Sequence, residues 1–376
     1  MHFARRSQYG WIGADFGARV VKVAQLVRSD GEVRLAGCAA IPLELPQAVG
    51  AAEAGSGPTW SAAPRGDAPA TAWRGGEQLG DAARAARELA EGLRGKAAAA
   101  AVSMRDCEVH LADLATADES PRRLGEATRS LLADVARTPL EALVFDAWPA
   151  GDAGAARSSK RYVLTLLRAS SDAAAEAVRE CGWRCRAIDA QPWAAARALA
   201  LSSEADPDRG DALLDWGASG AVLTWAARGV PLHVRPLKRA ALARIFAELE
   251  TRLGLFPEES RQLLANPDLP SATQGGLRLA AEIVRHGLAE VAEEIRRTLV
   301  YWRTLSRGGS PQGIVLAGGG ALLPGAVDAL ATSLALPVRA WDLPRCEAGE
   351  QGPATSLFAV AAGLSALAWE DRCSAL

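Results

Sequence analysis

Residues 15–22 of this 376-residue chain combine the side chains that a phosphate-binding turn needs. The glycine of this segment lets backbone amides approach an anion, the carboxylate can hold a hydrated metal ion, and the lysine adds a positive charge. Apolar and β-branched residues flank the turn, which predicts a hairpin over 11–27. Asp-x-Gly is also ordinary turn chemistry, so a single copy leaves a purely structural turn as the alternative. The segment reads Asp15-Phe16-Gly17-Ala18-Arg19-Val20-Val21-Lys22.

A second copy of the pattern lies in the other half of the chain. It again consists of an apolar strand, an Asp-aromatic-Gly-Ala turn and a second strand: Leu213-Leu214-Asp215-Trp216-Gly217-Ala218-Ser219, followed by Ala221-Val222-Leu223. Two such hairpins facing each other across a cleft would hold a metal-bound polyphosphate from both sides. The repeat therefore predicts two related halves with a shared phosphate site, with chance repetition as the alternative.

A glycine run supplies the third element. The segment 313–317 predicts a strand, Gly318, Gly319 and Gly320 follow it, and Pro324 stands near the first turn of a helix. Glycines remove side chains, so a flat nucleoside can lie against the backbone while helix amides face an anion. A tight strand-to-helix turn without a ligand is the alternative. In their order along the chain, the three elements predict a nucleotide site.

The composition excludes several classes of protein. The chain has 42 basic and 44 acidic side chains, a balance that argues against a nucleic-acid surface or a polybasic membrane face. Its hydrophobic share of 49% excludes disorder throughout. No run of apolar residues is long enough to span a membrane, and the first residues lead into a strand pattern, so we expect a cytoplasmic protein. The six cysteines form no zinc or redox spacing.

The remaining pattern predicts alternating strands and helices. A buried strand at 162–167, a helix from Ser170 to Cys181 and a strand ending at Asp189 predict a βαβ unit with a parallel strand pair. The segment 43–77 is rich in Ala, Gly, Pro and Ser, which predicts a disordered loop. Apolar residues recur at helical spacing over 278–304, which predicts a long helix with one core-facing side.

In these segments the chain resembles the actin-like ATPase superfamily and, within it, the PilM family of type IV pilus assembly proteins. The similarity covers nearly the whole chain apart from the insertion at 43–77. The matching text is Ile12-Gly13-Ala14-Asp15-Phe16-Gly17, Val21-Lys22-Val23-Ala24-Gln25-Leu26, Leu213-Leu214-Asp215-Trp216-Gly217-Ala218-Ser219, Glu294-Ile295-Arg296-Arg297-Thr298-Leu299-Val300-Tyr301-Trp302 and Leu316-Ala317-Gly318-Gly319-Gly320-Ala321-Leu322-Leu323-Pro324-Gly325.

The resemblance implies an α/β, actin-like two-lobed fold with duplicated ribonuclease-H-like lobes and a small subdomain inserted in lobe I. Lobe I would span 1–190, including the small subdomain at about 100–150 and the disordered loop. Lobe II would span 191–342. The C-terminal segment 343–376 would return to lobe I.

The resemblance also implies roles for individual residues. Asp15, Asp215 and Asp189 would be the catalytic carboxylates, and Asp15 and Asp215 would hold Mg²⁺ through water. ATP would be bound by a larger set of residues from both turns, the long helix and the glycine run: Gly17, Lys22, Gly217, Ser219, Glu294, Gly318, Gly319 and Gly320. Ala18 and Arg19 stand where the family usually has serines, a departure that bears mainly on hydrolysis.

By the same resemblance, the protein would be a nucleotide-binding scaffold of a type IV pilus or a related type II secretion machine. A groove beside the small subdomain would accept the cytoplasmic N-terminal tail of a PilN-like bitopic membrane protein, placing this protein peripherally at the inner membrane. Other assembly components and self-association are further expected contacts, whereas nucleic acid and direct membrane insertion are not. Any enzymatic activity would be at most weak ATP hydrolysis.

Three alternatives stay open at the level of sequence. A protein of the same fold with a cleft that turns over no nucleotide would act purely as an adaptor, as Ala18 and Arg19 favour. A small-molecule kinase of the sugar-kinase type would need a carboxylate aimed at a substrate hydroxyl, and no segment supplies a sugar-binding pattern. A filament-forming protein of cell division or cell shape would favour an amphipathic membrane helix at the end of the chain, which 369–376 does not provide.

Overall fold

The computed structural model describes most of the chain in eleven stretches. The predicted disordered loop at 43–77 lies outside them, apart from Leu43, and the predicted C-terminal segment lies only partly within them. The described residues are 7–43, 92–104, 106–114, 120–136, 138–150, 160–202, 210–237, 239–265, 273–306, 309–343 and 355–370.

The first sheet contains six strands around the first predicted hairpin. Its order is β1-β3-β2-β5-β9, with β4 pairing on β3. β3 is antiparallel to β2 and to β4, whereas β5 is parallel to β2 and to β9. The strands are β1 (Gln8–Tyr9), β2 (Ile12–Phe16), β3 (Val20–Ser29), β4 (Glu32–Pro42), β5 (Ala97–Val102) and β9 (Arg184–Ala190).

The second sheet repeats this plan around the second hairpin. Its order β12-β11-β10-β13-β14 matches β4-β3-β2-β5-β9 strand for strand and direction for direction. The predicted duplication is therefore confirmed as a pair of matching sheets, the centres of the two lobes. The strands are β10 (Asp211–Trp216), β11 (Ala221–Ala227), β12 (Val230–Leu237), β13 (Ile314–Ala317) and β14 (Val338–Ala340).

A third, antiparallel sheet of three strands lies between β5 and β9 in the chain, and we call it the small sheet. Its order is β6-β8-β7, and α2 (Pro121–Val135) and the short helix η2 (Leu140–Ala142) connect β6 to β7. Ser120 caps α2 by accepting a hydrogen bond from the Arg123 amide. The strands are β6 (Cys107–Asp113), β7 (Leu143–Pro149) and β8 (Lys160–Leu167).

The βαβ unit predicted over 162–189 is wrong in its strand pairing. β8 pairs antiparallel with β6 and β7, and β9 pairs with β5 in the first sheet instead. The segment does contain the expected helix, α3 (Arg168–Glu180). A strand-helix-strand pattern specifies the elements but not their partners, because a buried strand can pair with strands from elsewhere in the chain.

The predicted lobe boundaries at 190 and 342 stay a prediction.

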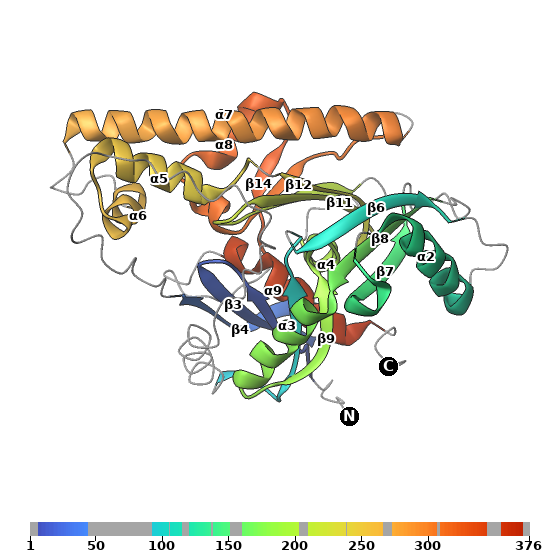
Figure 1. Cartoon of the computed structure of the whole chain (residues 1–376). Coiled ribbons are helices and arrows are strands. Elements are labelled where there is room, and N and C mark those ends of the chain that lie inside the picture. The colour runs from blue at the N-terminus through green and yellow to red at the C-terminus, as the bar shows by residue number, and fades with distance from the viewer. Residues whose placement is uncertain are drawn as a thin grey trace, which may run out of the picture.

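Helices cover the sheets, and the longest one, α7, packs along the second lobe (Figure 1). Thr273 caps α7 by accepting a hydrogen bond from the Gly276 amide, and the buried stripe from Ile283 to Trp302 confirms the predicted core-facing side. α7 spans Gln274–Leu305, and the remaining helices of the described stretches are α4 (Gln191–Leu201), α5 (Leu242–Leu253), α6 (Pro257–Ala265), α8 (Ala326–Leu334), α9 (Ala359–Ala366) and the short η3 (Gly319–Leu322), η4 (Thr355–Phe358) and η5 (Leu367–Trp369).

Two helices of small residues meet at the centre of the molecule. α9 packs on β2, β3 and β5 of the first lobe and on α4, which in turn packs on β10, β11 and β12 of the second. A Cβ atom on Gly363 would lie 1.9 Å from the Ala194 carbonyl oxygen, and one on Gly13 would lie 1.9 Å from that of Ala361. Both positions therefore need glycine because backbone meets backbone there.

We expect Gly363→Ala to lower the free energy of unfolding by about 1–3 kcal/mol, because the new methyl group has to push α4 and α9 apart. Urea unfolding measures this loss. Gly125→Ala on α2 is the matched control, since no atom outside its own stretch of helix lies within 4 Å of the place its methyl group would take. That substitution in a helix is expected to stabilise slightly, by up to ~1 kcal/mol. Equal effects of the two variants would contradict a close α4–α9 contact.

Candidate functional site

The two hairpin turns place Asp15 and Asp215 at equivalent positions. Asp15 lies opposite Lys22 on the antiparallel neighbour and opposite Ala101 on the parallel one. Asp215 lies opposite Val222 and Ala317 in the same arrangement. Each carboxylate thus stands near the end of a central strand where the sheet gives way to loops. Parallel sheets bind ligands at this edge.

The glycine after each aspartate closes its turn with a backbone hydrogen bond. The Gly17 amide donates to the Val20 carbonyl at 3.1 Å, and the Gly217 amide donates to the Gly220 carbonyl at 2.9 Å. The first amides of α5 support the second turn, because Leu242 and Ala243 donate to the carbonyls of Gly217 and Ala218 at 3.2 and 2.9 Å. The start of α5 therefore holds the second turn in place.

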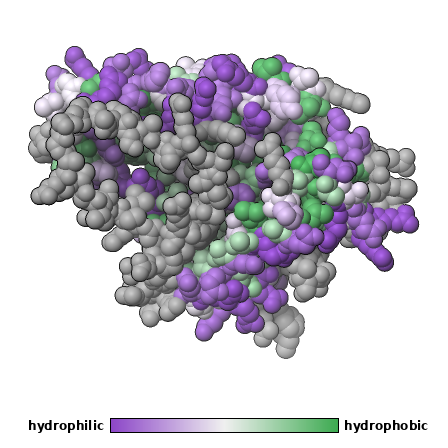
Figure 2. All heavy atoms as spheres, in the orientation of Figure 1, coloured by the Kyte–Doolittle hydropathy of each residue, from purple (hydrophilic) through white to green (hydrophobic). Residues whose placement is uncertain are grey.

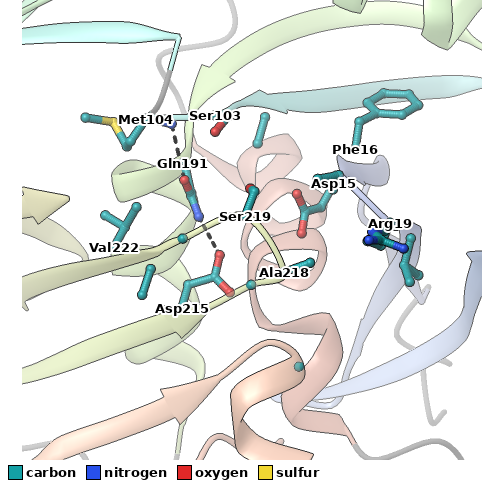
Figure 3. Close-up of a pocket in the computed structure, with 18 of the residues that line it drawn as sticks. Asp15, Phe16, Arg19, Ser103, Met104, Gln191, Asp215, Ala218, Ser219 and Val222 are labelled. Atoms are coloured by element: carbon teal, nitrogen blue, oxygen red, sulfur yellow. Dashed lines mark hydrogen bonds between the residues drawn. The ribbon is translucent and has the colours of Figure 1, made fainter. Parts of the chain in front are cut away.

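The two turns line one cavity of about 680 Å³. Asp15 and Asp215 enter it from opposite sides, and Ser219 lies on the second turn between them (Figure 3). The wall is completed by the residues that follow β5, by Gln191 at the start of α4 and by Gly319. The structure thus brings together most of the predicted ligands of a polyphosphate: Asp15, Gly17, Lys22, Asp215, Gly217, Ser219 and Gly319.

A buried lysine balances the two carboxylates. The Lys22 ammonium forms an ion pair with Asp15. Burial alone would lower the pKa of Lys22, but the charges of Asp15 and Asp215 outweigh it and raise the pKa above its ordinary value. Burial raises the pKa of Asp215, while the charge of Lys22 opposes that shift. The site therefore carries a lysine that remains charged and can face either a carboxylate or a phosphate.

Gln191 is the site residue that the sequence did not reveal. Its side-chain amide donates to Asp215, and its carbonyl oxygen accepts a 3.4 Å hydrogen bond from the Met104 amide. These contacts join the backbone after β5 in the first lobe to a carboxylate of the second (Figure 3). Ser103 and Met104 also line the cavity and were not predicted. The available signal for Gln191 was its position just after the predicted strand that ends at Asp189.

The glycine run meets the site through one residue. Gly319 lines the cavity, whereas Gly318 and Gly320 do not line it. A Cβ atom on Gly318, whose φ is +74°, would lie 2.5 Å from an Asp215 oxygen, and one on Gly320 would lie 2.4 Å from the Trp216 ring. These two glycines are needed so that the run can pack against the strand that carries Asp215.

Two further predicted site residues, Asp189 and Glu294, do not line the cavity. The carboxylate of Asp189 pairs with Arg197, which also binds Glu370 at 2.7 Å, so this carboxylate belongs to a buried ion-pair network. Burial raises the pKa of Asp189, and the charge of Arg197 opposes that shift. Glu294 lies on α7 and does not line the cavity. Neither residue is positioned to touch a ligand between the two turns.

The residues at the turns fit a hydrated divalent ion and the phosphates that accompany it. Carboxylate oxygens are the ligands that Mg²⁺ prefers, and this ion usually keeps several of its waters. Within the described stretches, no group of three or more His, Cys, Asp or Glu side chains could hold a metal ion. The two carboxylates suit an ion that is bound through water and shared with a phosphate ligand.

We expect Lys22→Met to destabilise the fold by about 3–5 kcal/mol in urea unfolding at pH 7, because it leaves Asp15 and Asp215 buried without their cation. Adding Asp215→Asn removes one of the two charges, so the double variant should recover part of the loss. Arg19→Met is the control on the exposed side of the same turn, with an expected change within about 0.5 kcal/mol. Equal losses for Lys22→Met with and without Asp215→Asn would contradict the charge pairing.

Comparison with known proteins identifies the fold. The chain matches a solved structure described as a PilM–PilN type IV pilus biogenesis complex with a TM-score of 0.71 and 20% identity, over 96% of this chain and 99% of that chain. It also matches the ethanolamine utilization protein EutJ from Carboxydothermus hydrogenoformans with a TM-score of 0.49 and 13% identity, over 96% and 90% of the two chains.

Two further comparisons found no match. No family model matches the chain, and no curated protein matches it. Among the described residues, no helix is long and apolar enough to cross a membrane. The strand order of the two sheets and the likeness to the PilM–PilN structure together show that this chain has the actin-like, two-lobed α/β fold with a small inserted sheet.

Proposed function

We propose that this protein is an actin-like, nucleotide-binding scaffold in the assembly of a type IV pilus or a related type II secretion machine. One observation supports the proposal above all: two matched Asp-x-Gly turns line a single cavity, in a fold that aligns over nearly its whole length with a chain of a PilM–PilN complex. The resemblance of the sequence points to the same family.

The cavity would take ATP with Mg²⁺. Asp15 and Asp215 would hold the hydrated ion, and Lys22, Ser219 and the turn amides near Gly17 and Gly217 would bind the phosphates. Gly319 would lie against the nucleoside. When bound, Mg²⁺ supplies positive charge that neutralises the phosphate oxygens. Asp189 and Glu294 are left out of the proposed site because neither reaches the cavity.

The residues of this chain would act mainly by positioning. Gln191 connects the Met104 backbone of the first lobe with Asp215 of the second, so a ligand that displaces Gln191 from this carboxylate changes a contact between the lobes. A nucleotide that touches both turns would therefore favour one arrangement of the lobes over another. Turnover would be slow at most, because Ala18 and Arg19 replace the hydroxyls expected on the first turn.

The partner would be the cytoplasmic tail of a PilN-like membrane protein, held beside the small sheet. This interaction would place the chain peripherally at the inner membrane, where it could also meet other assembly components and further copies of itself. Hydrophobic side chains gather over the region of β6 and the adjacent end of α7, whereas the outer side of α7 is mainly hydrophilic (Figure 2). Leu111 on β6 and Val300 and Tyr301 near the end of α7 are exposed.

Calorimetric titration with ATP and Mg²⁺ tests the cavity. We expect micromolar binding, and more than about tenfold weaker binding by Asp15→Asn, because the carboxylate that holds the hydrated ion is lost. The matched control is Asp189→Asn, a carboxylate outside the cavity. It should lower thermal stability by breaking the pair with Arg197 while leaving the ATP affinity unchanged.

Other results would select an alternative. No heat and no thermal shift with folded protein would favour an adaptor whose cleft binds no nucleotide. Steady phosphorylation of a sugar would favour a small-molecule kinase. Weaker ATP binding by Asp189→Asn would show that this residue acts at the cavity after all.

Fluorescence anisotropy with a labelled N-terminal peptide of a PilN-like protein tests the partner. We expect Leu111→Asp to weaken binding by more than about tenfold, because a charge replaces an exposed apolar contact beside the proposed groove. Phe256→Ser is the control, since Phe256 is 74% exposed near α6, away from the small sheet. Equal binding by the wild type and both variants would place the tail elsewhere on the protein.

A further inference from the structure

The small sheet is connected to the first lobe and packs against both lobes. The chain enters it from β5 and leaves it through α3 to β9, and both strands lie in the first sheet. Leu166 of β8 packs with Val102 of β5, but other side chains of the small sheet pack against the second sheet. Trp148, Tyr162 and Leu164 share one hydrophobic cluster with Val222 on β11 and Val234 on β12.

A buried hydrogen-bond network fastens this contact, and we call it the Tyr162 network. The Tyr162 hydroxyl on β8 lies 2.8 Å from Nδ1 of His233 on β12, and Nε2 of His233 lies 2.6 Å from Oγ of Ser306 at the end of α7. Each of the three residues is less than 9% exposed. One imidazole thus connects the small sheet, the second sheet and the longest helix.

The imidazole is neutral in this position. Burial lowers the pKa of His233 to about 4, so at pH 7 one ring nitrogen donates a hydrogen bond and the other accepts one. Burial also raises the pKa of Tyr162, which keeps its hydroxyl protonated. Both contacts are therefore satisfied at once, and losing either partner leaves a polar atom buried without its hydrogen bond.

Aromatic rings enclose the network and fix its geometry. His233 stacks on Trp302 of α7 with ring centroids 5.7 Å apart and lies against Trp225 of β11 at 5.4 Å. Tyr162 stacks on Trp148 at 5.7 Å, and Trp148 meets Trp193 of α4 edge-on at 5.9 Å. Such contacts between rings restrict rotation of each side chain.

The same cluster forms part of the cavity wall. Met104 and Val222 belong to the cluster and also line the cavity. Cys107, the first residue of β6, packs against the cluster and lines the cavity as well. The small sheet therefore bridges the two lobes next to the cavity, and the first residue of its strand β6 is part of the cavity wall.

We propose that the small sheet is a clasp that holds the two lobes together over the cavity, and that the Tyr162 network must open before the lobes can separate. The clasp goes beyond the nucleotide-binding function and does not rest on it, because every contact involved lies within this chain. A protein with no affinity for ATP would still need to break the network in order to open.

The thiol of Cys107 provides a reporter of opening. Maleimide labelling of the full chain without ligand, followed by peptide mass spectrometry, gives the modification rate of each cysteine. We expect Tyr162→Phe and Ser306→Ala each to label Cys107 about tenfold faster, the effect of losing one buried hydrogen bond. Tyr301→Phe is the matched control, because the Tyr301 side chain near the end of α7 is 52% exposed and is not part of the network.

Two internal comparisons separate opening of the cavity from other changes. Cys181 is buried in the first-lobe core and should keep its wild-type labelling rate in all variants. Hydrogen exchange of peptides covering 211–221 should accelerate in Tyr162→Phe, because the second turn becomes open to solvent. The proposal is overturned if Cys107 keeps its wild-type rate, if Cys107 and Cys181 accelerate together, or if 211–221 exchanges as in the wild type.

Discussion

The close approach of α4 and α9 is the constraint on which the two-lobed arrangement depends. α9 lies on the strands of the first lobe, α4 lies on those of the second, and the two helices meet at Gly363 with no room for a side chain. Because this contact joins backbone to backbone, it sets how the sheets face each other. The edges that carry Asp15 and Asp215 then line one cavity.

Charge balance is the second requirement of this arrangement. Two aspartates in one cavity would repel each other. The positive charge of Lys22, on the strand next to Asp15, reduces this repulsion. Gln191 satisfies Asp215 from the start of α4. The polar groups at the junction of the lobes thus depend on partners from other elements, and a ligand with phosphates would compete for the same partners.

The small sheet adds a connection that the duplicated sheets lack. It is inserted after β5, yet its Tyr162 and Trp148 side chains bury themselves against the second lobe. The two lobes are thereby joined at two places. The first is the α4–α9 contact together with Gln191, and the second is the hydrogen bond between Tyr162 and His233. This arrangement also places the start of β6 at the cavity, because Cys107 lines the cavity wall.

Much of the fold was predictable from sequence because its signals are local. The two Asp-x-Gly hairpins, the glycine run before α8 and the apolar stripe of α7 each specify an element and its buried side within a few residues. The duplication was visible for the same reason, since equal turns need equal residues. Asp15, Lys22 and Asp215 could be named because short turns place them directly.

The pairing of elements was decided only by tertiary structure. β8 looked like part of a βαβ unit, but strand pairing depends on which edges are free in three dimensions, and it joined the small sheet. The family resemblance implies a catalytic role for Asp189, yet its carboxylate pairs with Arg197 on α4 and does not line the cavity. Gln191, His233 and Tyr162 carry no local pattern at all. Their roles exist only where separate segments are packed together, which is why the sequence determined the turns and the structure decided what joins them.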